Sequence, residues 1–127
     1  MIKIKHLFDA AEKDDGMRLW VEPIGLCKDL CEWCQVNQLM CQVAPPMHLW
    51  EWFEKHPDGY GHFRGTYHEV LSKSAWRPAL QQLASASQKQ NFTLIHQGDD
   101  PAQNTATALY EFIVELQSYC PPESTGT

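Results

Sequence analysis

The sequence predicts an α/β fold: a small three-layer domain in which helices cover a sheet of three or four strands. Segment 91–116 carries the main observation, because a short apolar run, a polar turn and a long stretch with helical spacing follow one another there. Apolar and basic residues alternate in segment 2–8, which is typical of a strand with one buried face. Between residues 59 and 90, large apolar residues recur at spacings of three and four, which indicates amphipathic helices.

The first two strands are predicted near the amino end of the chain. Ile2 and Ile4 alternate with lysines in segment 2–8, so one face of this strand is expected to be basic. Residues 14–16 have the composition of a turn, and residues 17–22 follow as a second strand. The connection is too short for a crossover helix, so the two strands are expected to be antiparallel if they are neighbours.

The middle of the chain predicts four helical segments separated by proline and glycine. Their predicted ranges are 26–35, 46–56, 59–71 and 76–90, whereas residues 37–43 are ambiguous.

The second of these helices is rich in aromatic residues. Trp50, Trp52 and Phe53 cannot all face one side of a helix. One of the two tryptophans is therefore expected either under a neighbouring segment or at the surface, where it would favour a partner interface.

Segment 91–116 predicts a strand, a loop and a helix. Asp100 has the side chain of a helix N-cap, Pro101 suits the first helical position, and Gln103 completes a capping box. In open α/β folds, ligands bind beyond the carboxyl ends of strands. The loop 96–104 is therefore the first place to expect a binding site.

Composition limits the class of protein. The chain has 127 residues, 43% of them hydrophobic, which is enough for one domain with its own core, predicted over residues 1–120. Residues 121–127 are polar and contain two prolines, so they are predicted to form a disordered tail. The formal net charge is -6 and the basic residues form no stripe, which disfavours binding to nucleic acid.

The start of the chain has no signal-peptide pattern, and no apolar run approaches the ~20 residues of a membrane span. A cytoplasmic protein without a membrane partner is therefore expected. Five cysteines, an odd number, agree with reduced thiols in that compartment.

Three cysteines form the sharpest local pattern. Cys27, Cys31 and Cys34 have the C-x-x-x-C-x-x-C spacing of radical S-adenosylmethionine enzymes, which hold an iron-sulfur cluster. Such enzymes need a barrel around the cluster, which 127 residues cannot supply. The spacing also fits one stripe of small buried residues on a helix, and this interpretation predicts no cofactor. A zinc site that includes Cys41 and His48, an iron-sulfur cluster and a redox dithiol stay as alternatives.

An ordered set of short motifs resembles one known family. The motifs are Asp14-Asp15-Gly16 with Arg18 and Val21-Glu22, Ala44-Pro45 with Leu49, Trp52-Phe53 and His56-Pro57, the helix of Phe63, Tyr67 and Leu71, and Thr93-Leu94-Ile95 before Asp100, Asn104 and Ala106. In this order they are similar to the YeaO-like proteins of domain-of-unknown-function family 488, and the resemblance covers residues 2–118. It implies a small three-layer α/β domain without an assigned biochemical function.

The chain departs from the family at polar positions. Two arginines that the family carries after the second strand are missing here, where Glu22 is followed by Pro23. The family's histidine-asparagine-histidine is Gln103-Asn104-Thr105, and its basic residue before the turn is Asp99. The resemblance therefore implies a non-catalytic or vestigial domain that binds a small molecule or a protein, and a homodimer is compatible with this prediction.

We expect the ligand pocket where the second and third predicted strands end, around Glu22, Pro23, His96, Gln97 and Asn104. Without the arginines it should be neutral to acidic and bind phosphate poorly. The alternative is an enzyme or a metal-binding protein that uses the cysteines or a pocket of His96 with Asn104. The candidate pocket residues are Arg18, Glu22, His96, Gln97, Asp99 and Asn104.

Overall fold

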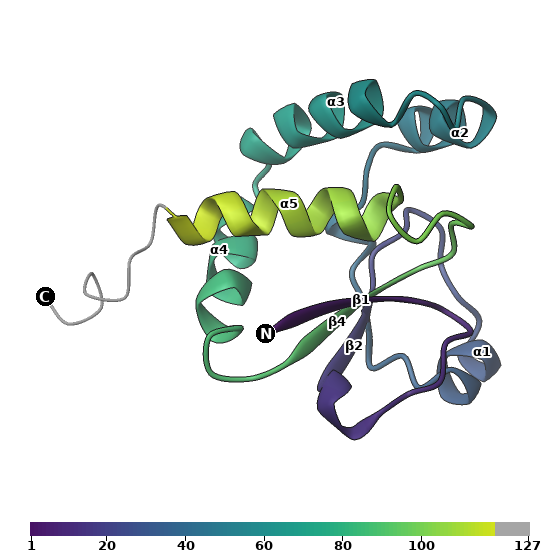
Figure 1. The fold of residues 1–127 in the computed structure, drawn as a ribbon, viewed down its shortest axis with the longest axis vertical. Coiled ribbons are helices and arrows are strands. Elements are labelled where there is room, and N and C mark those ends of the chain that lie inside the picture. The colour runs from purple at the N-terminus through teal and green to yellow at the C-terminus, as the bar shows by residue number, and fades with distance from the viewer. Residues whose placement is uncertain (119–127) are drawn as a thin grey trace, which may run out of the picture.

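The computed structural model of the protein describes residues 1–118 and shows a parallel sheet with helices against it (Figure 1). This arrangement confirms the predicted α/β fold class, whereas the predicted tail 121–127 lies outside the described residues. The elements are β1 (Ile2–His6), the short 3-10 helix η1 (Lys13–Asp15), β2 (Met17–Trp20), α1 (Lys28–Trp33), β3 (Gln38–Leu39), the 3-10 helix η2 (Cys41–Val43), α2 (Met47–Lys55), α3 (Tyr60–Ser72), α4 (Arg77–Ala86), β4 (Phe92–His96) and α5 (Thr105–Ser118).

The sheet is organised around β4. Its strand order is β1-β4-β2-β3, and every pairing is parallel. Leu94 of β4 lies opposite Ile4 of β1 on one side and opposite Leu19 of β2 on the other. All five residues of β4 are buried, as expected for a central strand covered on both faces.

The relation of β1 to β2 differs from the one expected for neighbouring strands. β4 lies between them, so they do not pair, and both run parallel to β4. The antiparallel expectation, which applied only to neighbouring strands, therefore does not apply, and the two strands run in the same direction. The ten residues 7–16 lead from the end of β1 to the start of β2, at the opposite edge of the sheet, with only the short 3-10 helix η1 between them. Local sequence did not reveal this, because the separating strand lies more than 70 residues further along the chain.

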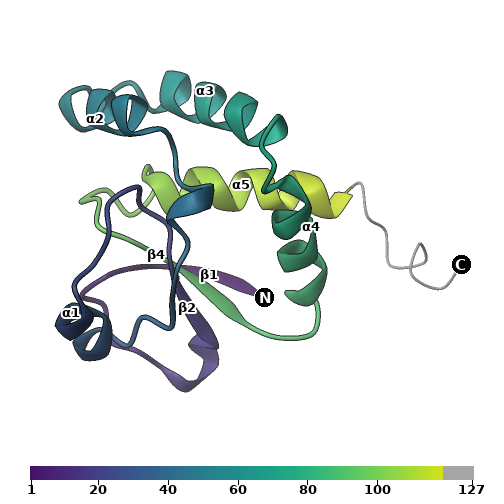
Figure 2. The ribbon, with the colours of Figure 1, turned by 180° about the vertical axis from the view of Figure 1, so that it is seen from behind.

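One face of the sheet carries the main core. Figures 1 and 2 both show α5 between the sheet and the pair formed by α2 and α3, with α4 beside α5. Phe63, Tyr67 and Leu71 of α3 are buried, at the spacing that predicted this helix. Within the described residues, none of the helices has the length and apolar character that crossing a bilayer requires.

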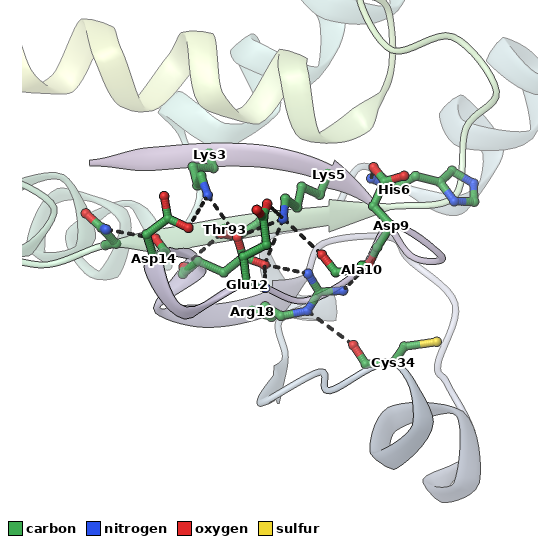
Figure 3. A network of polar contacts seen from close by, with 12 residues as sticks. Lys3, Lys5, His6, Asp9, Ala10, Glu12, Asp14, Arg18, Cys34 and Thr93 are labelled. Carbon is green, nitrogen blue, oxygen red and sulfur yellow. Dashed lines mark hydrogen bonds and ion pairs between the residues drawn. The ribbon is translucent and has the colours of Figure 1, made fainter.

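The other face is covered in two different ways. Near the end of β2, Trp20, Ile95, Leu7 and Cys34 form a second buried cluster, against which Leu30 of α1 packs. Elsewhere on this face, polar side chains from the strands meet the connection between β1 and β2 (Figure 3). The third layer is therefore part helix and part loop.

The predicted buried stripe of cysteines is wrong. Cys34 is 7% exposed, whereas Cys31 is half-buried and Cys27 is exposed. Trp33 of the same helix is 86% exposed. The physical reason is that α1 has only six residues, and Cys27 and Cys34 lie at its caps, outside the regular helical spacing.

The last helix begins later than predicted. Asp100 does cap a turn, since its Oδ1 accepts the amides of Ala102 at 2.8 Å and Gln103 at 3.2 Å, but α5 begins only at Thr105. Asn104 caps this helix, because its Oδ1 accepts the amide of Thr107 at 2.8 Å. Asp100 and Asn104 can both cap a helix, so the sequence left the start of the helix ambiguous. The prediction used Asp100, the first of the two.

Asn104→Ala should therefore destabilise the protein more than Asp100→Ala. Loss of a buried N-cap is expected to lower the free energy of unfolding by about 1 to 2 kcal/mol, whereas Asp100 is exposed and holds only the preceding turn. Urea denaturation of both variants measures the difference. A larger loss in Asp100→Ala would mean that the helix is capped four residues earlier.

Candidate functional site

A cavity of about 210 Å³ lies where β2 and β4 end and where the loop after β4 faces α2. It brings together four of the predicted pocket residues, Glu22, Gln97, Asp99 and Asn104. Pro23 does not line it. The full lining is Glu22, Trp50, Phe53, Glu54, Pro57, Gln97, Gly98, Asp99, Asp100, Gln103, Asn104 and Thr105.

Glu22 forms the buried floor of this cavity and is 2% exposed. Its Oε1 accepts the indole N–H of Trp50 at 3.1 Å, its Oε2 accepts the amide of Gln97 at 3.0 Å, and the side chain of Thr105 also hydrogen-bonds to it. Burial raises the pKa of Glu22, while these hydrogen bonds oppose the rise. One carboxylate thus connects β2 to α2, to the loop after β4 and to the start of α5.

Sequence analysis missed the wall that α2 contributes. Trp50, Phe53 and Glu54 line the cavity although they lie about 30 residues after Glu22 and more than 40 before Gln97. The available signal was the amphipathic pattern of this helix, in which Trp50 and Phe53 lie three residues apart and can share one side. That pattern indicates burial, but it does not indicate which strand ends the helix will face.

The remaining groups make the cavity acidic. Among the described residues that line it, four are carboxylic acids and none is lysine, arginine or histidine. Asn104 has both ends of its amide engaged, because its Nδ2 donates to the backbone oxygen of Asp100 at 2.8 Å while its Oδ1 caps α5. The one polar position of the last motif that matches the family is therefore used to begin the helix.

His96 lies in a second cavity of about 290 Å³, with Lys5, His6, Asp9 and Asp99 among its lining residues. Burial, and then the neighbouring His6, lower the pKa of His96 to about 4, although Asp9 opposes the shift. Its Nδ1 accepts the amide of Gly98 at 3.1 Å, so the neutral ring carries its hydrogen on Nε2. His96 and Asn104 do not line the same cavity.

Arg18 lines neither cavity, and its side chain belongs to the polar network on the face of the sheet opposite α5 (Figure 3). Its Nη1 donates to Oδ2 of the buried Asp15 at 2.8 Å, and its Nε donates to the backbone oxygen of Cys34 at 3.2 Å. Lys3 and Lys5 of β1 contact the other carboxylate oxygen of Asp15, at 3.0 and 2.9 Å. Arg18 therefore joins the strands to the loop between them and does not contribute charge to the cavity.

The Asp15 carboxylate is strongly stabilised as an anion. Burial by itself would favour the neutral acid, but hydrogen bonds from Lys5 and Lys3, the backbone amide of Glu12 and Arg18 hold the pKa of Asp15 well below its usual range. Its backbone oxygen also accepts the hydroxyl of Thr93 at 2.8 Å. The network therefore attaches the crossing loop to the central strand as well as to its two neighbours.

Within residues 1–118, one group of three potential metal ligands has its donor atoms within 4.8 Å of one another: Glu12, Asp14 and Asp15. These carboxylates already pair with Lys3 and Lys5. The four cysteines that the structure describes do not form such a group. Burial, followed by the neighbouring Cys27 and Cys34, raises the pKa of Cys31, which disfavours the thiolate that metals bind. The absence of a cofactor stays a prediction.

These features define the class of protein: a small parallel α/β domain with an acidic cavity at the carboxyl edge of its sheet. The family model described as DUF488-N3i, the inactive DUF488-N3 subclade, matches residues 1–120, and the chain belongs to this family. The resemblance to the YeaO-like proteins, which are DUF488 members, is confirmed at this level.

Uncharacterized proteins of Mycobacterium bovis and Mycobacterium tuberculosis are similar to this chain. Each is 29% identical to it over 92 residues, which cover 68% of this chain and 73% of the relative. No solved structure matches the chain.

A substitution at Asp15 tests the network around this carboxylate. Asp15→Asn should lower the free energy of unfolding by about 3 kcal/mol, because it leaves the buried Arg18 and two lysines without their shared anion. Asp14→Asn is the matched control, since Asp14 is exposed and its carboxylate pairs with the partly exposed Lys3, and it should leave denaturant unfolding nearly unchanged. Equal effects of the two changes would contradict a structural role for the buried carboxylate.

The low pKa of His96 should make the stability of the protein depend on pH. Between pH 4 and its ordinary value of 6.5, the folded protein binds fewer protons at His96 than the unfolded chain, so stability should fall as pH is lowered through this range. We expect the free energy of unfolding to fall by about 2 kcal/mol over this range. This is less than the pKa difference alone would give, because solvent in the cavity screens the charge.

His96→Gln should remove this pH dependence, since an amide does not titrate. Subtracting the variant's unfolding free energy from that of the wild type at each pH cancels the contribution of other acids. A difference that is flat from pH 4 to 7 would mean that His96 keeps an ordinary pKa.

Proposed function

We propose that the protein is a non-catalytic binding domain that holds a small ligand in the cavity at the ends of β2 and β4. The observation that carries this proposal is the state of Glu22. It is the buried carboxylate of the cavity, and it already accepts hydrogen bonds from Trp50, Gln97 and Thr105. A general base needs a lone pair directed at the substrate, and this carboxylate directs its oxygens at the protein.

Two further observations support binding over catalysis. The neutral His96 has its acceptor nitrogen occupied by the amide of Gly98, so it is not free to take a proton from a substrate. The described lining residues of the Glu22 cavity include no cysteine, serine or lysine, and the one hydroxyl group among them, that of Thr105, already hydrogen-bonds to Glu22. The family model's description of its subclade as inactive agrees with this proposal.

We also propose that the protein acts in the cytoplasm. Cys27 is an exposed free thiol and Cys31 a half-buried one, and such groups persist in a reducing compartment.

Titration with a fragment set of cations, anions and neutral molecules tests the binding proposal. We expect at least one fragment to produce saturable nuclear magnetic resonance shifts at the amides of Gln97, Gly98 and Asp99 and at the indole of Trp50, because these groups border the cavity. If fragments of every charge leave these signals unchanged, the cavity is not a binding site.

Inorganic phosphate at low ionic strength is the negative control. It should cause no saturable shift at residues 97–104, because the described lining residues offer no cationic side chain. Saturation at millimolar phosphate would indicate an anion site.

A further inference from the structure

We propose that the ligand of the Glu22 cavity is a small organic cation, an ammonium group attached to a flat apolar body. This inference rests on the proposed binding function and adds the chemical class of the ligand. Three properties of the cavity support it. Two of its exposed carboxylates are negative and have no partner among the described residues, its wall is aromatic, and backbone amides at its edge already donate hydrogen bonds within the protein.

The charges at the mouth are negative and unpaired. Glu54 reaches the cavity from α2 and Asp99 from the loop after β4, so they approach it from two separate segments. Both residues are exposed, and within residues 1–118 neither carboxylate has a hydrogen-bond or salt-bridge partner. A cation between these segments would provide the counterion that the chain itself does not place there.

The wall is aromatic and rigid. Trp50 is held through its indole N–H by Glu22 at 3.1 Å, so its ring has a fixed position beside the buried carboxylate. Phe53 is stacked on Phe63 with ring centroids 4.4 Å apart and planes 14° apart, which fixes it from the core side. Aromatic faces attract cations and pack well against flat apolar groups. The wall therefore favours an apolar body that carries positive charge.

The start of α5 borders the cavity, and helix amino ends ordinarily favour anions. Four backbone amides at this edge are engaged within the protein. The amide of Gln97 donates to Glu22, that of Gly98 to His96, and those of Ala102 and Gln103 to Asp100. An anion would meet carboxylates in place of these four N–H groups, which weakens the usual preference of this edge for anions.

The volume sets the size of the ligand. At about 210 Å³, the cavity is smaller than the roughly 300 to 1,000 Å³ of sites for drug-sized molecules. A single aromatic ring with a short aminoalkyl group is a suitable probe, because the ring can contact Trp50 and Phe53 while the ammonium group faces Glu54 and Asp99.

Three isosteric probes separate charge from shape: benzylammonium, benzyl alcohol and benzoate, each titrated at pH 7 and low salt. Benzylammonium should bind about tenfold more tightly than benzyl alcohol, because it gains cation–π and charge contacts, and benzoate should bind weakest. Binding of benzyl alcohol or benzoate as tight as that of benzylammonium overturns the inference, while the cavity remains a binding site. Failure of all three probes also overturns it, and the wider fragment set then decides whether any ligand binds.

Paired substitutions test the origin of the selectivity. The double variant Glu54→Gln with Asp99→Asn removes both unpaired charges at exposed positions. The control Glu51→Gln with Asp29→Asn removes two exposed charges that do not line the cavity. The first variant should lose about fivefold or more in benzylammonium affinity and none for benzyl alcohol, while the control keeps both affinities. Equal losses in the two variants, or no loss in either, would show that the cavity charges do not recognise the cation.

Discussion

The parallel pairing of β4 with β1 on one side and β2 on the other is the interaction on which the rest of the structure depends. All five residues of β4 are buried, so this strand contributes to the cores on both faces of the sheet. Because β4 lies between β1 and β2, the connection between these two strands crosses the sheet. It also places the loop 97–104 beside the end of β2, and the cavity forms there because Glu22 then meets the amide of Gln97.

Two buried carboxylates show how surroundings assign different roles to the same chemical group. Asp15 is surrounded by cations, which keep its pKa low and use Lys3, Lys5 and Arg18 within one network. Glu22 is surrounded by neutral donors, and burial raises its pKa. Arg18 binds Asp15 on the other face of the sheet, so it does not neutralise the negative charge of the cavity. The acidity of the cavity therefore follows from where the chain places its cations as well as from where it places its acids.

The sequence predicted some residues of the candidate site and missed others, and this difference has a physical cause. Glu22 ends the second predicted strand, and Gln97, Asp99 and Asn104 belong to the predicted loop 96–104. The ends of parallel strands meet at one edge of a sheet. Arg18 was grouped with them but precedes the end of β2, and its side chain points to the opposite face. His96 was separated from Asn104 because its ring turns toward His6, with centroids 5.5 Å apart. The contribution of α2 depends on packing between distant segments, which no local pattern encodes.

The sequence by itself determined the class of fold, the helices α3 and α4 and the buried strand β4, because apolar periodicity and prolines act within a few residues of one another. Tertiary structure decided the order of the strands, the first residue of α5 and the exposure of the cysteines. Each of these features depends on a choice that local sequence leaves open. Two residues can cap α5, either face of the short α1 can be buried, and each strand can pair with different neighbours. Only contacts between residues far apart in the chain distinguish such options, as the pairing of β1 with β4 does across some 90 residues.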